Sequence, residues 1–343
     1  MTKNIAILGT GANGSCIAAD LIDAGVDVTL IDYWPEHVEA MRASGLRIQM
    51  IETDDLHVSV RAHHLTDVAT FSEKFDIVLL VLKAYDTEWA CHFIKPYLKP
   101  DGLLVGVQNG MVAEEIAEIV GPSRTLGCVV ELGSELATPG FVERNTTRDE
   151  TWFGVGSMDP STEGREDEIV DLLRHTGNVD VVPDILSAKW MKLIVNTMIM
   201  TPIAILGLPT NEAIEVPGLR ALMVRLGAES LLAGESLGHE TIPIMGLTVE
   251  DIANRDTVPE VLMDELTARL RPGGLNTLLM DYRRGRKTEA TLVNGIVADE
   301  LERLGHDGSA NAAVTAISER ITRGELEPAI TNLDLIQAML PPE

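Results

Sequence analysis

The chain has 343 residues, of which 45% are hydrophobic, so it is long enough for about two globular domains with substantial cores. Its 53 acidic and 27 basic side chains give a formal net charge of -26, which argues against a general nucleic-acid or anionic-membrane surface. The three cysteines, Cys16, Cys91 and Cys128, form no C-x-x-C pair and suit a reducing compartment. We therefore predict a soluble, cytoplasmic protein with neither a nucleic-acid nor a membrane partner.

The first part of the chain alternates strand-like and helix-like segments. The predicted strands are residues 5–8, 26–31, 46–50, 56–60, 75–82, 103–107, 125–130, 151–156 and 179–184, with 46–50 and 56–60 as a hairpin. The predicted helices are residues 12–24, 35–44, 87–94, 113–120 and 163–173. Such alternation predicts a mostly parallel sheet that helices cover on both faces.

From Ile185 onward the pattern is helical, and we find no convincing strand there. The predicted helix stops are Gly207, Gly238 and Gly305, and the predicted breaks or starts are Pro202, Pro217, Pro259 and Pro272. The apolar stretch 193–208 is shorter than the roughly 18 to 20 residues that a membrane span needs, so it predicts a core helix. The expected fold class is α/β: a Rossmann-type doubly wound sheet domain over residues 1–184, followed by an all-helical domain over 185–343.

A glycine-rich segment, GTGANG, follows the first predicted strand and opens the first predicted helix. It matches G-x-G-x-x-G, in which Gly9 permits the tight turn, Gly11 lets a pyrophosphate approach and Gly14 allows close packing of helix on strand. The backbone amides of Ala12 and Asn13 lie in the first helical turn, where the helix dipole favours an anion. The segment therefore predicts a dinucleotide-binding loop, which the acidic net charge does not oppose.

Asp32 directly follows the second predicted strand, eighteen positions after Gly14. An acidic residue at this place accepts hydrogen bonds from a ribose 2′-hydroxyl and repels a 2′-phosphate. No arginine or lysine lies between Asp32 and Met41 to bind such a phosphate. We therefore expect NAD, with NADP less favoured; the alternative is that Asp32 only helps to begin the helix at Pro35.

The core helix carries two polar residues, Lys192 and Asn196, in the segment WMKLIVNTMIM. Residues four apart share one face of a helix, so these two side chains point into the same space. One interpretation is that Lys192 extends to solvent while Asn196 satisfies a backbone group. The other is that the two form part of a catalytic site.

Further motifs occur in register along the chain: VLKAYDT at 81–87, QNG at 108–110, WMKLIVN at 190–196 and NTLLMDYRRGRKTE at 276–289. With the glycine-rich loop, they resemble the ketopantoate reductase (2-dehydropantoate 2-reductase) family over nearly the whole chain. The K-x-x-x-N helix followed by G-R-x-T-E is much more specific than the loop, which many families share. The resemblance implies reduction of a 2-oxo acid by a nicotinamide cofactor.

The resemblance also assigns roles to the polar residues of the second part. Lys192 becomes the general acid toward the substrate carbonyl oxygen, Asn196 a substrate-contacting amide, and Glu289 the carboxylate that completes the site. The chemistry agrees, because hydride transfer to a ketone leaves negative charge on oxygen, which an ammonium group can stabilise and protonate. Thr277 falls where the family has a substrate-contacting serine, so a hydroxyl is preserved.

Lys83 and Asn109 match positions that the family places beside the cofactor and substrate. Three features depart from the family: Met200 replaces a second asparagine eight residues after the lysine, Asp32 replaces a basic residue of NADP-using members, and segment 238–276 is longer. With no asparagine at 200, we expect Met200 to line the substrate pocket and to favour apolar 2-oxo acids over ketopantoate.

The function that we predict is NAD-dependent reduction of a 2-oxo acid to a (D/R)-2-hydroxy acid, with a homodimer plausible. One alternative is an NADP-dependent ketopantoate reductase of pantothenate synthesis, and another is a non-catalytic NAD-binding redox sensor. No metal site is expected, because the histidine pair His63-His64 lies on a strand, where adjacent side chains point to opposite faces.

Overall fold

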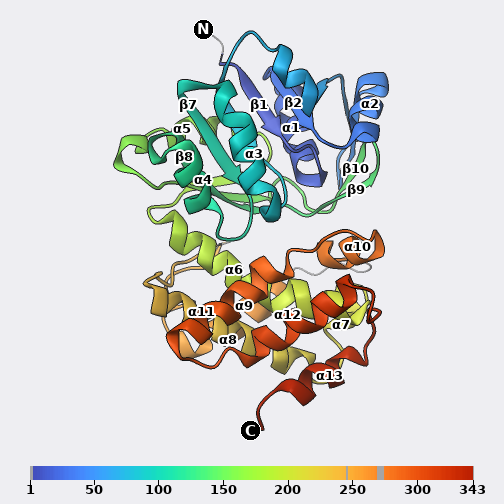
Figure 1. Ribbon diagram of the computed structural model, residues 1–343, viewed down its shortest axis with the longest axis vertical. Helices are drawn as coiled ribbons and strands as arrows, with labels where there is room; N and C mark the ends of the chain where they lie inside the picture. The colour runs from blue at the N-terminus through green and yellow to red at the C-terminus, as the bar shows by residue number, and fades with distance from the viewer. Residues whose placement is uncertain (1–2, 245, 269–273, 343) are drawn as a thin grey trace. The chain divides into compact units, whose positions relative to one another are not determined.

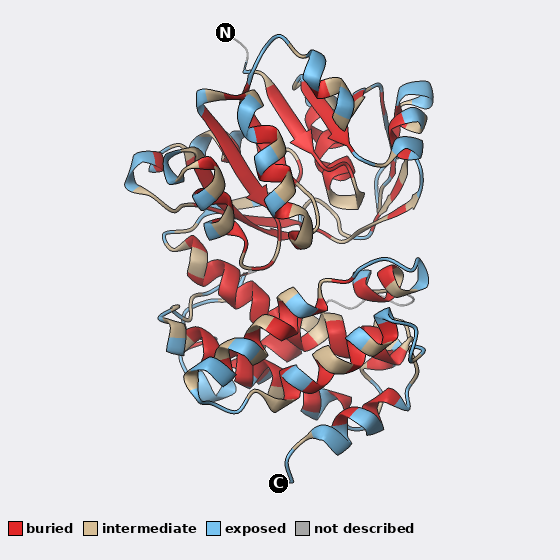
Figure 2. Ribbon diagram, in the orientation of Figure 1, coloured by how far each residue is buried: buried red, intermediate tan, exposed pale blue. Residues whose placement is uncertain are grey.

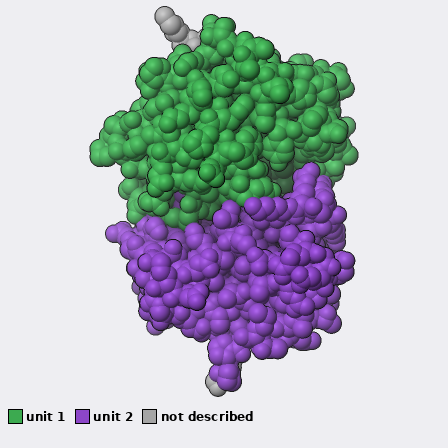
Figure 3. Space-filling view, in the orientation of Figure 1, with its two compact units in different colours: residues 1–186 green, residues 187–343 purple. Residues whose placement is uncertain are grey.

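The computed structural model describes residues 3–244, 246–268 and 274–342, and it divides the chain into two compact units, residues 1–186 and 187–343 (Figure 3). This division falls close to the domain boundary predicted from the sequence, which lies between residues 184 and 185. The first unit is built on β-strands and the second on helices, so the predicted fold class, a Rossmann-type sheet domain followed by a helical domain, is confirmed (Figure 1).

The described residues of the first unit form an eight-stranded sheet with the order β12-β11-β8-β7-β6-β1-β2-β5. Its strands are β1 (Ile5–Leu8), β2 (Val28–Asp32), β5 (Arg61–His64), β6 (Phe75–Leu80), β7 (Leu98–Val107), β8 (Thr125–Glu131), β11 (Trp152–Ser157) and β12 (Asn178–Val181). Neighbouring strands are parallel except β11, which runs antiparallel to β8. The chain winds outward from β1 in one direction and from β6 in the other, so the topological switch point, where such sheets bind ligands, lies between β1 and β6.

Helices of the first unit connect these strands. They are α1 (Ala12–Asp23), α2 (Pro35–Ser44), α3 (Thr87–Ile94), α4 (Ala113–Val120) and α5 (Glu166–Leu173). The predicted bounds of α2, α3 and α4 are confirmed, and α3 packs beside α4 while α1 contacts α5. The strands β1, β2 and β8 are buried along almost their whole length, which explains why they are continuous apolar segments of the sequence.

A second, four-stranded sheet with the order β4-β3-β10-β9 packs against α1. Its strands are β3 (Leu46–Gln49), β4 (Leu56–Val58), β9 (Ser134–Thr138) and β10 (Phe141–Arg144). The predicted hairpin is confirmed as the antiparallel pair β3 and β4. The β9–β10 hairpin was not predicted, because both strands are short and rich in polar residues, and β10 pairs in parallel with the distant β3.

The second unit contains no strand among its described residues, as predicted. Its helices are α6 (Ile185–Leu206), which begins at the boundary, α7 (Thr210–Ala213), α8 (Leu219–Leu237), α9 (Val258–Ala268), α10 (Thr277–Arg283), the π-helical turn η7 (Thr291–Gly295), α11 (Ile296–Leu304), α12 (Ser309–Thr322) and α13 (Asn332–Met339). Gly207, Gly238 and Gly305 follow helix ends with positive φ, which confirms the predicted stops.

Two of the prolines that were predicted to break or begin helices, Pro272 and Pro202, do not confirm this prediction. Pro272 lies outside the described residues. The predicted break at Pro202 is wrong, because α6 continues through it to Leu206. Helix α6 is long and apolar enough to cross a membrane. However, 89% of an apolar 18-residue stretch of it is buried within the protein, as expected of a core helix (Figure 2).

Candidate active site

The glycine-rich loop connects β1 to α1 at the switch point of the sheet. A Cβ atom on Gly9, where φ is +97°, would lie 2.8 Å from the Val81 carbonyl oxygen, and one on Gly14 would lie 2.0 Å from the Gly9 carbonyl oxygen. A Cβ on Gly11, by contrast, would have no atom within 4 Å. Gly9 and Gly14 therefore serve packing, while Gly11 leaves its side of the loop open.

The first turn of α1 fits a pyrophosphate. Gly11 is the N-cap of the helix and provides no side chain to bond the first amides, which belong to the half-buried Ala12 and Asn13 and to Gly14. The Asn13 side chain is fixed separately, because its Oδ1 accepts a hydrogen bond from Ser134 Oγ at 2.6 Å. Ser134 lies on the unpredicted strand β9, and nothing in the sequence indicated this contact.

Asp32 braces the loop from the end of β2. Its Oδ2 accepts hydrogen bonds from Thr10 N at 2.6 Å and Thr10 Oγ1 at 2.9 Å, and its Oδ1 accepts one from Trp34 N at 2.8 Å. The residue is only 5% exposed. A carboxylate offers about four acceptor sites, so these three bonds leave capacity for a ribose hydroxyl. The bond to Trp34, the N-cap of α2, agrees with the alternative that Asp32 helps to begin this helix, whereas the sequence did not indicate the bonds to Thr10.

The carbonyl of Thr10 is held by His37, a buried residue of α2. His37 Nε2 lies 2.7 Å from Thr10 O, and Nδ1 accepts a hydrogen bond from Gly140 N at 2.9 Å, so the neutral ring carries its proton on Nε2. Burial lowers the pKa of His37, although the nearby Asp32 carboxylate works in the opposite direction. Protonation of Nδ1 would place its N–H against the N–H of Gly140, and two donors cannot bond each other. The ring therefore stays neutral in the folded protein.

Folding stability is expected to fall in mild acid because of His37. Its folded pKa is below the unfolded value of about 6.5, so its contribution is complete above that pH and is lost as the pH falls below it. We expect the free energy of unfolding to fall by up to about 1.4 kcal/mol per pH unit more in the natural protein than in His37→Gln. Urea unfolding at pH 7, 6 and 5 measures this difference, and parallel pH curves would contradict the assignment.

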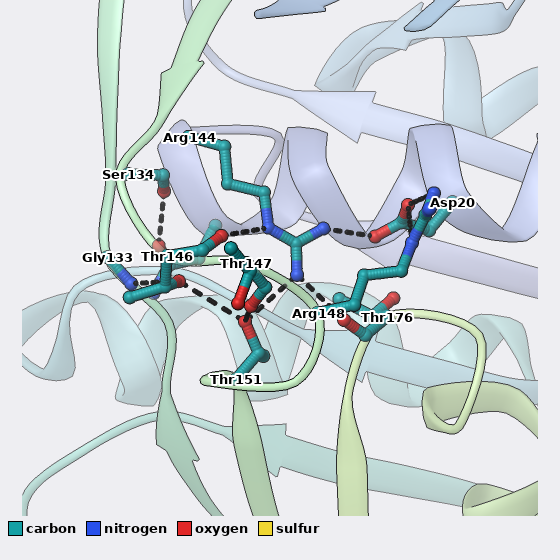
Figure 4. A network of polar contacts seen from close by, with 10 residues as sticks. Asp20, Gly133, Ser134, Arg144, Thr146, Thr147, Arg148, Thr151 and Thr176 are labelled. Carbon is teal, nitrogen blue, oxygen red and sulfur yellow. Dashed lines mark hydrogen bonds and ion pairs between the residues drawn. The ribbon is translucent and has the colours of Figure 1, made fainter. Parts of the chain in front are cut away.

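The far end of α1 is anchored by a buried ion pair (Figure 4). Arg144 Nη1 donates to Asp20 Oδ2 at 2.8 Å, and neither side chain is exposed. The same guanidinium donates to Thr151 Oγ1 at 2.9 Å and to Thr176 O at 2.7 Å, while Arg148 bonds the second oxygen of Asp20. Because the buried charge is paired and bonded on several sides, it fixes the helix whose first turn is predicted to bind a phosphate.

Lys83 and Asn109 follow neighbouring strands, β6 and β7. Gln108 links the two segments, because its Nε2 donates to Leu82 O at 2.9 Å and to Thr87 Oγ1 at 3.1 Å. Asn109 is half-buried, and its Oδ1 accepts a bond from Val130 N at 3.4 Å. The first unit thus holds both predicted residues at the carboxyl edge of its sheet. Gln108 belongs to the QNG motif, but the sequence alone did not indicate this role.

Lys192 and Asn196 lie on the buried part of α6. They are 4% and 3% exposed, so the interpretation that Lys192 extends to solvent is wrong. The Asn196 Nδ2 atom is buried and has no hydrogen-bond partner among the described residues. Leaving a buried donor unsatisfied costs about 1 to 3 kcal/mol, so this amide is a strong candidate for bonding a ligand.

The other predicted residues of the second unit lie around the C-terminal half of α6. Met200 is half-buried and packs on a small apolar cluster formed by Ala204, Leu278, Leu279 and Ala290. Thr277 is exposed at the start of α10, and the half-buried Glu289 directly precedes Ala290. The cluster therefore brings the segments of Thr277 and Glu289 to Met200.

Comparison with known proteins covers both units. The family model "Ketopantoate reductase PanE/ApbA" matches residues 5–157, and "Ketopantoate reductase PanE/ApbA C terminal" matches residues 184–322. The 2-dehydropantoate 2-reductase of Archaeoglobus fulgidus is 27% identical over 325 residues, with 94% of this chain and 99% of that protein covered. That of Pyrococcus abyssi is 30% identical over 301 residues, with 86% and 90% covered.

Solved structures with the same fold include two informative neighbours. The ternary structure of D-mandelate dehydrogenase with NADH and anilino(oxo)acetate has a TM-score of 0.81 at 20% identity, covering 94% of this chain and 98% of that one. A PanE/ApbA family ketopantoate reductase from Ralstonia eutropha JMP134 has a TM-score of 0.76 at 26% identity, covering 94% and 99%. With family models matching both units, the chain belongs to the ketopantoate reductase family of oxidoreductases, as the resemblance in its sequence indicated.

Proposed function

We propose that the protein is an NADH-dependent reductase of apolar 2-oxo acids, forming (D/R)-2-hydroxy acids, with Lys192 as the general acid. The observation that carries the proposal is the buried pair Lys192 and Asn196 on one face of α6, with Asn196 Nδ2 lacking a partner among the described residues. An ammonium and an unsatisfied amide together suit a substrate with a ketone oxygen and a carboxylate.

The proposed mechanism assigns one task to each side chain. When bound, the nicotinamide cofactor supplies the hydride. Lys192 donates a hydrogen bond to the ketone oxygen, stabilises the negative charge that develops on it, and delivers the proton. Asn196 donates to a substrate oxygen, and the hydroxyl of Thr277 offers a further polar contact. Glu289 is the carboxylate that would hold the Lys192 side chain in place.

Unit 1 offers a consistent set of groups for the dinucleotide. The open side of Gly11 and the first amides of α1, from Ala12 to Gly14, would hold the pyrophosphate. Asp32 would accept a hydrogen bond from the adenosine ribose, and Lys83 and Asn109 would flank the nicotinamide half. The open geometry of the loop supports these assignments. D-mandelate dehydrogenase, which has the same fold, was solved with NADH bound.

We expect NADH to give a higher kcat/KM than NADPH, because Asp32 would face the 2′-phosphate as a like charge. Asp32→Asn should narrow this preference by about tenfold, a change of ~1.4 kcal/mol. The asparagine of this variant keeps an acceptor for Thr10 N. Asp32→Ala, by contrast, removes all three hydrogen bonds that Asp32 accepts, and it should lower kcat/KM with both cofactors. Initial rates with both cofactors test this, and a preference of the unaltered protein for NADPH would refute the cofactor assignment.

A specific observation supports a second candidate, reduction of ketopantoate itself. The curated relatives compared above are both 2-dehydropantoate 2-reductases, and one of them covers 94% of this chain. Against it stands Met200, which offers an apolar thioether where a hydroxylated substrate needs a partner. A panel of branched, aromatic and hydroxylated 2-oxo acids, assayed by NADH oxidation, separates the two candidates. Cofactor binding without turnover of any of these acids would refute both and favour the sensor hypothesis.

A further inference from the structure

The catalytic helix α6 contains a proline in its last third, which changes the hydrogen bonding of the turn before it. Pro202 has no N–H to donate to the carbonyl of residue 198, and its ring disturbs the preceding turn. Carbonyl groups of that turn accept hydrogen bonds from two asparagine side chains outside the helix. These are Asn294 Nδ2 to Thr197 O at 3.1 Å, and Asn276 Nδ2 to Met200 O at 2.8 Å and Ile199 O at 3.3 Å.

Asn294 lies in the π-helical turn η7, five residues after Glu289, and is fully buried. Its Oδ1 accepts from Thr201 Oγ1 at 2.5 Å, and its Nδ2 also donates to Asn311 Oδ1 at 2.8 Å. Asn311 is held in turn by Glu229 Oε2 at 2.9 Å. Asn294 therefore has one fixed position against α6. Turns of π-helix occur frequently at functional sites.

Asn276 attaches α10 to α6, as Asn294 attaches η7 to it. It is the N-cap of that helix, because its Oδ1 accepts from Leu279 N at 2.9 Å, while its amide donates to the carbonyls of α6. The next residue is Thr277. One side chain thus begins α10 and attaches the Thr277 backbone to the turn of α6 that carries Met200.

We propose that Asn276 and Asn294 are positioning residues that hold the segments of Thr277 and Glu289 against the catalytic helix. The inference rests on the proposed function, since it assigns these residues an effect on turnover through Lys192, Thr277 and Glu289. A displacement of about 1 Å at a catalytic group can cost on the order of 10² in rate.

Asn332 provides a matched control. It is also a buried asparagine, 3% exposed, and its Nδ2 donates to an α6 carbonyl, that of Ile205, at 3.1 Å. This carbonyl lies beyond Pro202, away from the predicted catalytic residues. Asn332→Ala should therefore lower Tm as Asn294→Ala does, because each leaves a buried carbonyl without its partner, and it should not change the active site.

The experiment compares Asn294→Ala, Asn276→Asp and Asn332→Ala. Asn276→Asp keeps the acceptor that caps α10 but loses the donor to α6, so it separates the capping of α10 from its attachment to α6. It also provides a second variant in case Asn294→Ala does not fold. We expect the first two to lower kcat by about 10- to 100-fold with the Kd for NADH changed less than about twofold. Asn332→Ala should keep kcat within about threefold at a comparable loss of Tm.

Amide hydrogen exchange tests the attachment independently of turnover. Exchange in residues 277–295 should accelerate in Asn294→Ala and Asn276→Asp and stay unchanged in Asn332→Ala. Unchanged exchange there, or an equal loss of kcat in Asn332→Ala, would overturn the proposal. If the unaltered protein reduced no 2-oxo acid, the proposed function would fail, and the exchange data alone would decide whether the two asparagines hold these segments.

Discussion

Lys192→Met is expected to lower kcat by about 10² to 10⁴, the usual range for losing a positioned general acid. Methionine keeps most of the volume at this 4% exposed position, so the loss reports the missing ammonium and not a cavity. The Kd for NADH should change little, because the residues proposed to bind the cofactor belong to the first unit, whereas Lys192 belongs to the second. Steady-state kinetics and NADH fluorescence titration measure the two effects.

Two further variants make the Lys192 result specific. Lys192→Arg keeps a positive charge but holds its proton too tightly to release it, so it should recover little of the lost kcat. Lys189→Met removes another buried lysine from α6, one that is 2% exposed and that the proposed mechanism does not use. It should reduce Tm and leave most of the turnover. Equal losses of kcat in Lys189→Met and Lys192→Met would mean that α6 needs its lysines for folding and not for proton transfer.

Met200→Asn is expected to shift substrate preference toward ketopantoate. In the natural protein, Met200 presents an apolar, flexible side chain beside α10, and a hydroxylated substrate would leave a group poorly satisfied there. That deficit is about 1 to 3 kcal/mol, or about 5- to 150-fold in kcat/KM. An asparagine can bond the hydroxyl, so the ratio of kcat/KM for ketopantoate to that for 2-oxoisovalerate or phenylglyoxylate should rise by a factor in this range.

Met200→Leu is the control for packing, because it keeps an apolar side chain of similar volume against the small cluster that contains Leu278 and Ala290. It should retain the natural preference while Met200→Asn changes it, with both melting temperatures recorded. If the natural enzyme preferred ketopantoate by more than about tenfold, a difference of ~1.4 kcal/mol, Met200 would not determine specificity. The second candidate function would then be correct.

Local sequence patterns were enough to predict the elements that depend on neighbouring residues. The bounds of α2, α3 and α4 follow from apolar spacing and from stop and start residues within a few positions, and the structure confirms them. The role of Gly14 is equally local, because its backbone contact with Gly9 within the six-residue turn excludes a side chain, whereas the nearest contacts of Gly9 come from the distant Val81 and Leu82. Family membership also follows from short motifs in register.

Only the tertiary structure decided which groups satisfy the buried polar atoms. Asp32 bonds Thr10 across 22 residues, Arg144 pairs with Asp20 across 124, and Asn294 reaches Thr197 across 97. The continuation of α6 through Pro202 is also beyond local propensity, which predicts a break there, because burial of the helix within the protein depends on distant segments. A buried donor or acceptor must find a partner, but its own sequence neighbourhood does not specify which segment the fold will bring to it.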